Sequence, residues 1–145
     1  MYTHENFGAD VARNFAFLES EYGMRREPLH VAEAGSWVVY VNSLMKIVVE
    51  YEIGGYCGVS VLDLRHVKRD PLERSEFDLE EIIALSGSRQ TRRQEPRSMS
   101  EAVAKSAETL RSVGAPVLKG DFEPLHARQR KLVEAVRRSN PLSPN

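Results

Sequence analysis

Apolar residues follow three successive patterns along this chain, which predict a helix, then a sheet, then further helices. In the first segment they recur at steps of three and four, so they share one face of a helix with 3.6 residues per turn. These residues are Phe7, Val11, Phe15, Leu18 and Tyr22. Thr3 or Asn6 can cap the start of this helix, and Gly23 can end it. The chain therefore begins with an amphipathic helix that needs a surface to cover.

Between residues 29 and 64 the pattern changes to β-branched and aromatic residues separated by turn residues. Four segments are typical of strands: "LHVAEA", "SWVVYVN", "MKIVVEYEI" and "YCGVSVLDL". Asn42-Ser43 or Ser43-Leu44, and then Gly54-Gly55, suit the two-residue loops of tight hairpins. We therefore expect an antiparallel meander of three or four strands.

Counting residues from these loops assigns the side chains to the two faces of the sheet, because successive side chains in a strand point to opposite faces. The expected core face carries Met45, Ile47, Val49, Tyr51 and Ile53, together with Val38 and Tyr40. The expected opposite face carries Trp37, Val39, Val41 and Val48. A two-residue Gly54-Gly55 loop adds Cys57, Val59 and Val61 to this opposite face and Leu62 and Leu64 to the core. Both faces are then mostly apolar.

A sheet that is apolar on both faces is either sandwiched between helices or presents one face to a partner. The helices predicted later in the chain are sufficient to cover a second face, which favours the sandwich. The alternative is a partner surface around Trp37, because tryptophan is enriched at interface hot spots. Symmetric pairing of two copies through an apolar face or edge also remains open, which would make a homodimer.

Three helices are predicted after the sheet. Two of them begin with capping boxes, Asp78 with Glu81 and Ser98 with Glu101. Gly87 and Gly114 end these two helices, and Asp121 can cap the last one. The apolar side of the last helix comprises Leu125, Leu132, Val133 and Val136. The fold class is therefore α+β, with one helix before the meander and about three after it.

The length of 145 residues fits a single domain, residues 1–145, with a core of ordinary size. A formal net charge of −1 gives no field that would draw the whole molecule to nucleic acid or to an anionic membrane. The amino terminus lacks the pattern of a signal peptide, and no apolar run is long enough to span a bilayer. We expect a cytoplasmic protein with no membrane partner and with a disordered tail at residues 140–145.

The segment between the second and third helices, residues 87–97, is rich in arginine and has no large apolar side chain. Its composition favours a mobile, solvated loop. The alternative is a phosphate-binding arm that acts together with the basic last helix. Its candidate residues are Arg89, Arg92, Arg93 and Arg97. Stacking of single-stranded bases would require aromatic residues nearby, and none lies between Phe77 and Phe122.

The sequence contains no catalytic, cofactor-binding or metal-binding motif that we recognise. The four histidines, His4, His30, His66 and His126, show no metal-binding spacing, so a metal site would require residues distant in sequence to meet in space. Cys57 lies on an expected strand, where a lone cysteine is typically a small buried apolar residue. We therefore expect no enzyme, cofactor or metal; an enzyme that uses Cys57 and a histidine is the alternative.

The order of "FAFLESEYGM", "SWVVYVNSLMKIVVEYE" and "LEEIIALSG" resembles that of small bacterial α+β proteins of unassigned function. It is also similar to the helix–meander–helix immunity proteins of polymorphic toxin systems. The resemblance implies a stoichiometric inhibitor of a partner protein without catalysis, and it transfers no functional residues. The face around Trp37 and the acidic segment 70–81, with Glu73 and Glu76, would be its binding surfaces. An acidic surface suits a cationic partner such as a nuclease toxin.

Overall fold

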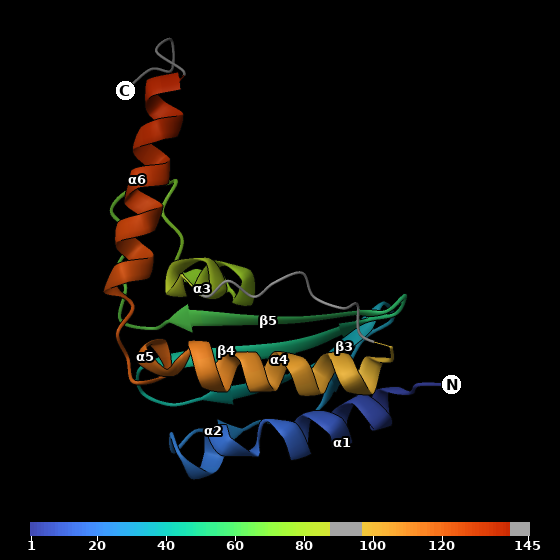
Figure 1. The fold of residues 1–145 in the computed structure, drawn as a ribbon. Helices are drawn as coiled ribbons and strands as arrows, with labels where there is room; N and C mark the ends of the chain where they lie inside the picture. The colour runs from blue at the N-terminus through green and yellow to red at the C-terminus, as the bar shows by residue number, and fades with distance from the viewer. Residues whose placement is uncertain (88–96, 140–145) are drawn as a thin grey trace.

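The computed structural model describes residues 1–87 and 97–139, which form helices and one antiparallel sheet, as expected for the α+β class (Figure 1). The helices are α1 (His4–Asn14), α2 (Ala16–Ser20), α3 (Leu79–Ser86), α4 (Met99–Val113), α5 (Ala115–Leu118) and α6 (Glu123–Ser139). The strands are β1 (Arg25–Arg26), β2 (His30–Val31), β3 (Gly35–Val41), β4 (Met45–Glu52), β5 (Tyr56–Asp63) and β6 (Glu76–Asp78). The expectations for residues 88–96 and 140–145 lie outside the described residues.

The sheet has the strand order β1-β3-β4-β5-β6, and β2 also pairs with β3. Its centre is the predicted meander, but the two outer strands β1 and β6 were not predicted. β1 consists of two exposed arginines, and β6 has a single apolar residue between two acids, so neither shows a recognisable alternation. That residue, Phe77, is nevertheless fully buried. The expected strand "LHVAEA" shortens to the two residues of β2.

The hairpin between β3 and β4 has the predicted side-chain parity. Val38 pairs with Val49 and Tyr40 pairs with Ile47, and all four are buried on the core face. The side chain of Asn42 closes the turn. Its Oδ1 accepts hydrogen bonds from the backbone N–H groups of Leu44 and Met45, at 2.8 and 3.0 Å. This local Asx geometry explains why the turn could be located from sequence.

The predicted register of the hairpin between β4 and β5 is wrong by one residue. Glu52 pairs with Tyr56, so the loop contains three residues, 53–55, instead of the expected two. A shift of one residue moves every side chain of a strand to the other face. The side chains of Cys57, Val59 and Val61 therefore lie on the core face, and that of Leu62 lies on the opposite face, while Leu64 is exposed beyond the strand. Gly54 and Gly55, both with positive φ, make the wider loop accessible.

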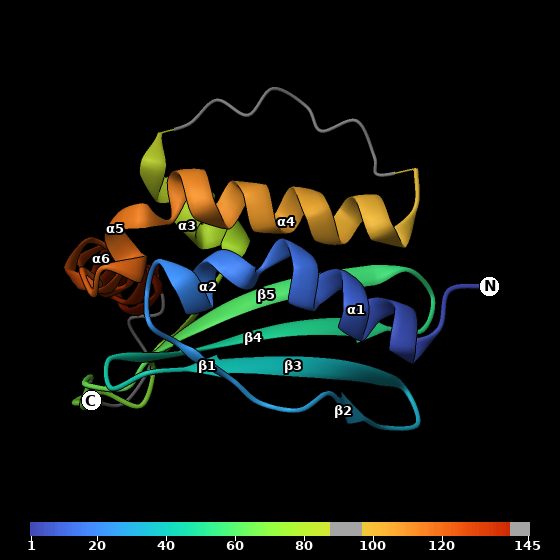
Figure 2. The same cartoon turned by 90° about the horizontal axis from the view of Figure 1, so that it is seen from below.

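Helices α1, α2 and α4 cover one face of the sheet (Figure 2). The N-terminal cap of α1 uses both predicted residues, because Thr3 and Asn6 exchange side-chain-to-backbone hydrogen bonds of 3.0 Å. The expected single helix is divided at Phe15, where the backbone leaves helical geometry, yet Phe15 remains fully buried. Asp78 and Ser98 cap α3 and α4 as predicted, and Gly87 ends α3 with φ of 67°. The glutamates of the two expected capping boxes bind other groups, because Glu81 accepts from the side chain of Arg74 and Glu101 from the backbone of Arg97.

A buried carboxylate connects the first helix to α4. Asp10 is 6 % exposed, and its Oδ2 accepts hydrogen bonds of 2.7 Å from the hydroxyls of both Tyr2 and Ser100. Its Oδ1 accepts a hydrogen bond from Arg13. Burial by itself would raise the pKa of Asp10, but the hydrogen bonds from Tyr2 and Ser100 and the charge of Arg13 outweigh it and lower that pKa. The charged carboxylate therefore holds residues that are far apart in sequence.

Helix α6 packs against the core near its start and then projects away from the sheet, where Arg137 still pairs with Asp70 of the segment that follows β5 (Figure 1). Leu125, His126 and Gln129 are buried, but Leu132 and Val136, which were predicted to face the core, are 47 % and 57 % exposed. Their helical spacing was correct, but this part of the helix does not reach the core of the sheet. Among the described residues, no helix is both long and apolar enough to cross a membrane.

Candidate functional site

The second face of the sheet carries the apolar candidates that the sequence grouped together. Trp37, Val39 and Val41 of β3 and Val48 of β4 alternate with core residues, and all four are partly exposed. Within residues 1–87 and 97–139, the helices lie on the other face or at one end of the sheet, so the expected sandwich does not form (Figure 2). His30 from β2 stacks on Trp37 with ring centroids 4.2 Å apart.

Acidic residues share this second face with the apolar side chains, and Glu50 pairs directly with Trp37. Glu50 pairs with Gly58 and Glu52 with Tyr56 on the neighbouring strand, and both carboxylates are exposed. The pKa of Tyr56 is raised, first by burial and then by the charges of Glu50, Asp78 and Glu52. The acidic side chains around the phenol of Tyr56 therefore disfavour its negatively charged form.

The two acidic candidates, Glu73 and Glu76, lie in different environments. Glu76 on β6 pairs with Leu62, is exposed and belongs to the same sheet face as Trp37. Its side chain helps to line an open hollow of about 430 Å³. The other residues that line this hollow are Ser60, Leu62, Lys68, Arg74, Ser75 and Asp78. Glu73, in contrast, is only 16 % exposed in its side chain and faces His66. Only Glu76 is placed to meet a partner at the second face.

The phosphate-binding candidates do not gather into one described surface. Arg89, Arg92 and Arg93 lie outside the described residues. Arg97 is exposed next to the start of α4, whereas α6 stands beyond its other end (Figures 1 and 2). The 15 residues of α4 separate these ends by about 21 Å. Several basic side chains of α6 are also neutralised by acids. The pairs are Arg130 with Glu123, Arg137 with Asp70, and Arg138 with Glu134.

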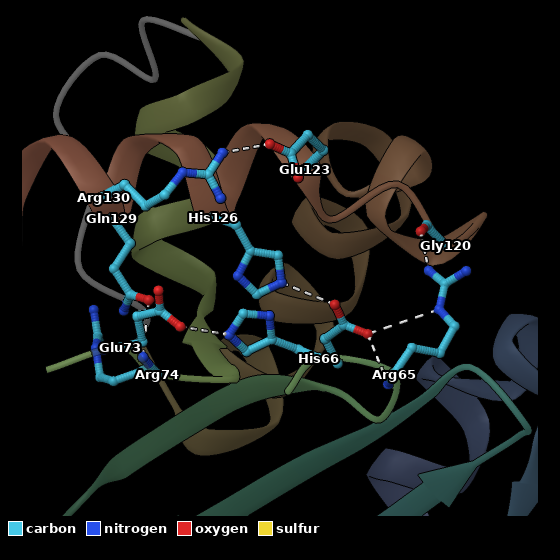
Figure 3. A network of polar contacts seen from close by, with 10 residues as sticks. Arg65, His66, Glu73, Arg74, Gly120, Glu123, His126, Gln129 and Arg130 are labelled. Carbon is cyan, nitrogen blue, oxygen red and sulfur yellow. Dashed lines mark hydrogen bonds and ion pairs between the residues drawn. The ribbon is translucent and has the colours of Figure 1, made fainter. Parts of the chain in front are cut away.

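A second polar cluster, which the sequence did not predict, lies where α6 packs against the end of β5. Asp63 is the last residue of β5, and its side chain points to the core side because it pairs with Met45. Nε2 of His126 on α6 donates a hydrogen bond of 2.8 Å to Oδ2 of Asp63. The ring of His66 stacks on that of His126 with centroids 4.0 Å apart (Figure 3). Glu73 lies beyond His66, with its Oε2 3.2 Å from Nε2 of that ring.

This cluster contains buried polar atoms that lack hydrogen-bond partners among the described residues. They are Nδ1 of His126, Nε2 of His66 and Nε2 of Gln129. Glu73 lies at ion-pair distance from His66 but outside hydrogen-bond geometry. Oε1 of Gln129, in contrast, accepts a hydrogen bond of 2.8 Å from the backbone of Arg74. Buried polar groups in folded proteins are almost always paired, so such a concentration of unpaired nitrogens needs a physical reason.

The donor atoms of three residues in this cluster are close enough to share a ligand. One atom each from Asp63, His66 and His126 lies within 4.8 Å of the others. Imidazole nitrogen and carboxylate oxygen are ligands of divalent transition metals. Only a faint signal of this site is present in the sequence, namely an aspartate and a histidine three positions apart at the end of a strand, because His126 comes 60 residues after His66.

Cys57 has the properties of a core thiol. It is partly buried on the core face, and burial raises its pKa to about 11, with Ser106 and Glu50 as smaller influences. At neutral pH the protonated thiol dominates, whereas nucleophilic cysteines depend on the thiolate. The alternative of an enzyme built on Cys57 therefore gains no support from the geometry of this residue.

No protein-family model, curated protein or solved structure matches this chain.

Proposed function

We propose that this protein is a non-catalytic protein-binding module that uses the second face of its sheet to bind a basic partner protein. The observation that carries the proposal is the stripe of partly exposed apolar side chains, centred on Trp37, on a sheet face that no described helix covers. A contiguous apolar surface of this kind is typical of an interaction site. Tryptophan is also the side chain that most often supplies a large part of the binding energy of an interface.

The charges around this stripe favour a basic partner. Glu50, Glu52, Glu76 and Asp78 occupy exposed strand positions on the same face, where the basic strand residues are Lys46 and Arg25, so acids outnumber bases. Acidic groups at the rim of an interface increase the rate of encounter with a cationic partner and disfavour acidic competitors. This combination of an apolar centre and an acidic rim is consistent with a stoichiometric inhibitor of the immunity type that neutralises a cationic toxin.

The experiment is affinity capture with the full chain from an extract of its native cells, with and without nuclease, followed by mass spectrometry. Trp37→Ala and Glu76→Lys test the second face. Leu132→Ala and Glu108→Lys are matched controls, because they truncate an exposed apolar residue and reverse an exposed acid on α6 and α4. We expect one basic protein in 1:1 ratio with the wild type and both controls. Its affinity should fall about 30-fold with Trp37→Ala.

Two outcomes contradict the proposal. Equal capture by both test variants and both controls would exclude the second face as the binding surface. Capture that disappears after nuclease treatment, together with steep salt dependence, would instead support the nucleic-acid alternative with Arg97 and α6. Sedimentation of the purified chain determines separately whether the face pairs with a second copy.

A further inference from the structure

A metal-ligand set is present at the cluster between β5 and α6, and it is independent of the second sheet face. We propose that Asp63, His66 and His126 bind a divalent transition-metal ion of the Zn²⁺ class, and that Glu73 positions His66 for this role. One donor atom from each of the three ligands already lies within 4.8 Å of the other two. The structure brings them together from the end of β5, the segment that follows it and α6.

The types of donor atom select the class of metal. Two imidazoles and one carboxylate suit Zn²⁺, Co²⁺, Ni²⁺ or Fe²⁺, whereas Mg²⁺ and Ca²⁺ prefer sites built almost entirely from oxygen. Free cysteine does not take part, because Cys57 lies on the core face of β5 at the opposite end from Asp63. Zn²⁺ is the natural test ion for this donor set, and Co²⁺ reports its geometry because its absorption depends on coordination.

Binding requires modest changes in distance and a rotation of the rings. The two imidazole planes are now nearly parallel, 19° apart, so the rings must turn until both lone pairs point at one ion. Zinc lies about 2.0–2.2 Å from nitrogen and oxygen ligands, so in a tetrahedral site the ligand atoms are about 3.3–3.5 Å apart. Nε2 of His126 and Oδ2 of Asp63 are now 2.8 Å apart and share a proton in a hydrogen bond. A metal ion at Nε2 takes the place of that proton, which in the neutral ring then resides on Nδ1.

In Asp63 and His66, one of the two donor atoms contacts a neighbouring protein group, and the other is left for the metal. Oδ1 of Asp63 accepts a hydrogen bond of 3.1 Å from the backbone N–H of Arg65, which leaves Oδ2 for the metal. Nε2 of His66 faces Glu73 at 3.2 Å, which leaves Nδ1 as the ring nitrogen for the metal. A carboxylate that holds the second nitrogen of a ligating histidine is a common support of metal sites.

The consequence of binding would be structural. The buried residues that anchor helix α6 are Leu125, His126 and Gln129, near its start, and the rest of the helix projects away from the sheet. Farther along, an ion pair joins Arg137 to Asp70. A metal shared by Asp63, His66 and His126 would connect this helix to the sheet and to the segment that carries Glu73.

The test uses tag-free protein, calorimetric titration with Zn²⁺ and absorption during titration with Co²⁺. We expect one ion per chain and the intense visible bands of tetrahedral Co²⁺. His66→Asn and His126→Asn should weaken binding at least about 100-fold, and Glu73→Gln about 10- to 100-fold. His30→Asn is the matched control, because it removes a histidine from the second face and should change nothing.

Circular dichroism of each variant without metal shows whether it is folded. If His126→Asn does not fold, His66→Asn and Glu73→Gln decide the question, because those side chains are less deeply buried. Absence of Zn²⁺ binding by the wild type at tens of micromolar would overturn the proposal. Equal binding by His66→Asn and His30→Asn would overturn it as well, because the ion would then bind elsewhere. Partner capture through Trp37 is unaffected by either result, so the two proposals fail separately.

Discussion

Two buried polar networks join distant parts of this molecule, and they differ in how completely their atoms are paired. Around Asp10, both carboxylate oxygens accept hydrogen bonds, from Tyr2, Ser100 and Arg13. Around the stacked rings of His66 and His126, three buried nitrogens lack a partner among the described residues (Figure 3). Both networks connect helices to other elements, so their locations alone do not explain the difference.

The difference separates a structural network from a candidate binding site. A buried polar atom without a partner loses its interaction with water and gains nothing in return, whereas a fully paired network stabilises the fold. The pairs around Asp10 are complete with protein atoms alone. The cluster of Asp63, His66 and His126 leaves nitrogens unpaired and also brings one donor atom of each residue within 4.8 Å of the others, close enough to share an ion. Mutations in the first network should therefore lower the free energy of unfolding strongly, and removal of an unpaired group in the second should change it little.

The largest effect is expected for Asp10→Ala. The substitution removes the acceptor shared by Tyr2 and Ser100, and hydrogen bonds to a charged group each contribute about 1.5–3 kcal/mol. We expect the free energy of unfolding to fall by about 2–4 kcal/mol in urea titrations. Glu108→Ala, an exposed position on α4, should change it by less than about 0.5 kcal/mol. A loss for Asp10→Ala as small as that of the control would show that the network is not stabilising.

A smaller effect is expected from acid. The pKa of Asp10 is lower in the folded protein than in the unfolded chain, so its contribution is complete above the unfolded value of about 3.9. That contribution is lost as the pH falls through the lower folded value. Urea titrations at pH 6 and pH 3 should therefore show that the free energy of unfolding falls more with acidification for the wild type than for Asp10→Asn. An identical loss for both proteins would mean that Asp10 has no depressed pKa.

The sequence predicted those parts of the fold that depend on short-range chemistry. The caps of α3 and α4 need only residues three positions apart, and the turn at Asn42 needs its own side chain and the next few backbone groups. The register of β5 failed because both a two-residue and a three-residue loop are open to adjacent glycines, and only the packing of Val59 and Val61 decides between them.

The candidate site was predictable only in part, for the same reason. Trp37, Val39, Val41 and Val48 share a face by simple alternation, so the apolar stripe could be found. The sequence could not show that the helices leave this face uncovered, because that depends on where the later helices pack. His66 and His126 meet only after β5 and α6 are assembled, and no spacing in the sequence records that contact.

The smallest effect is expected for Gln129→Met in the second network. The change removes the unpaired Nε2, which favours the folded state, and the hydrogen bond from the backbone of Arg74, which disfavours it. We expect the two terms to offset each other, with a net change in the free energy of unfolding within about 1 kcal/mol. Leu125→Ala, one turn earlier on α6 and 1 % exposed, should cost about 2–5 kcal/mol and confirms that this end of the helix is packed. If Gln129→Met instead cost as much as Leu125→Ala, the second network would be as tightly paired as the first, and the contrast between them would not hold.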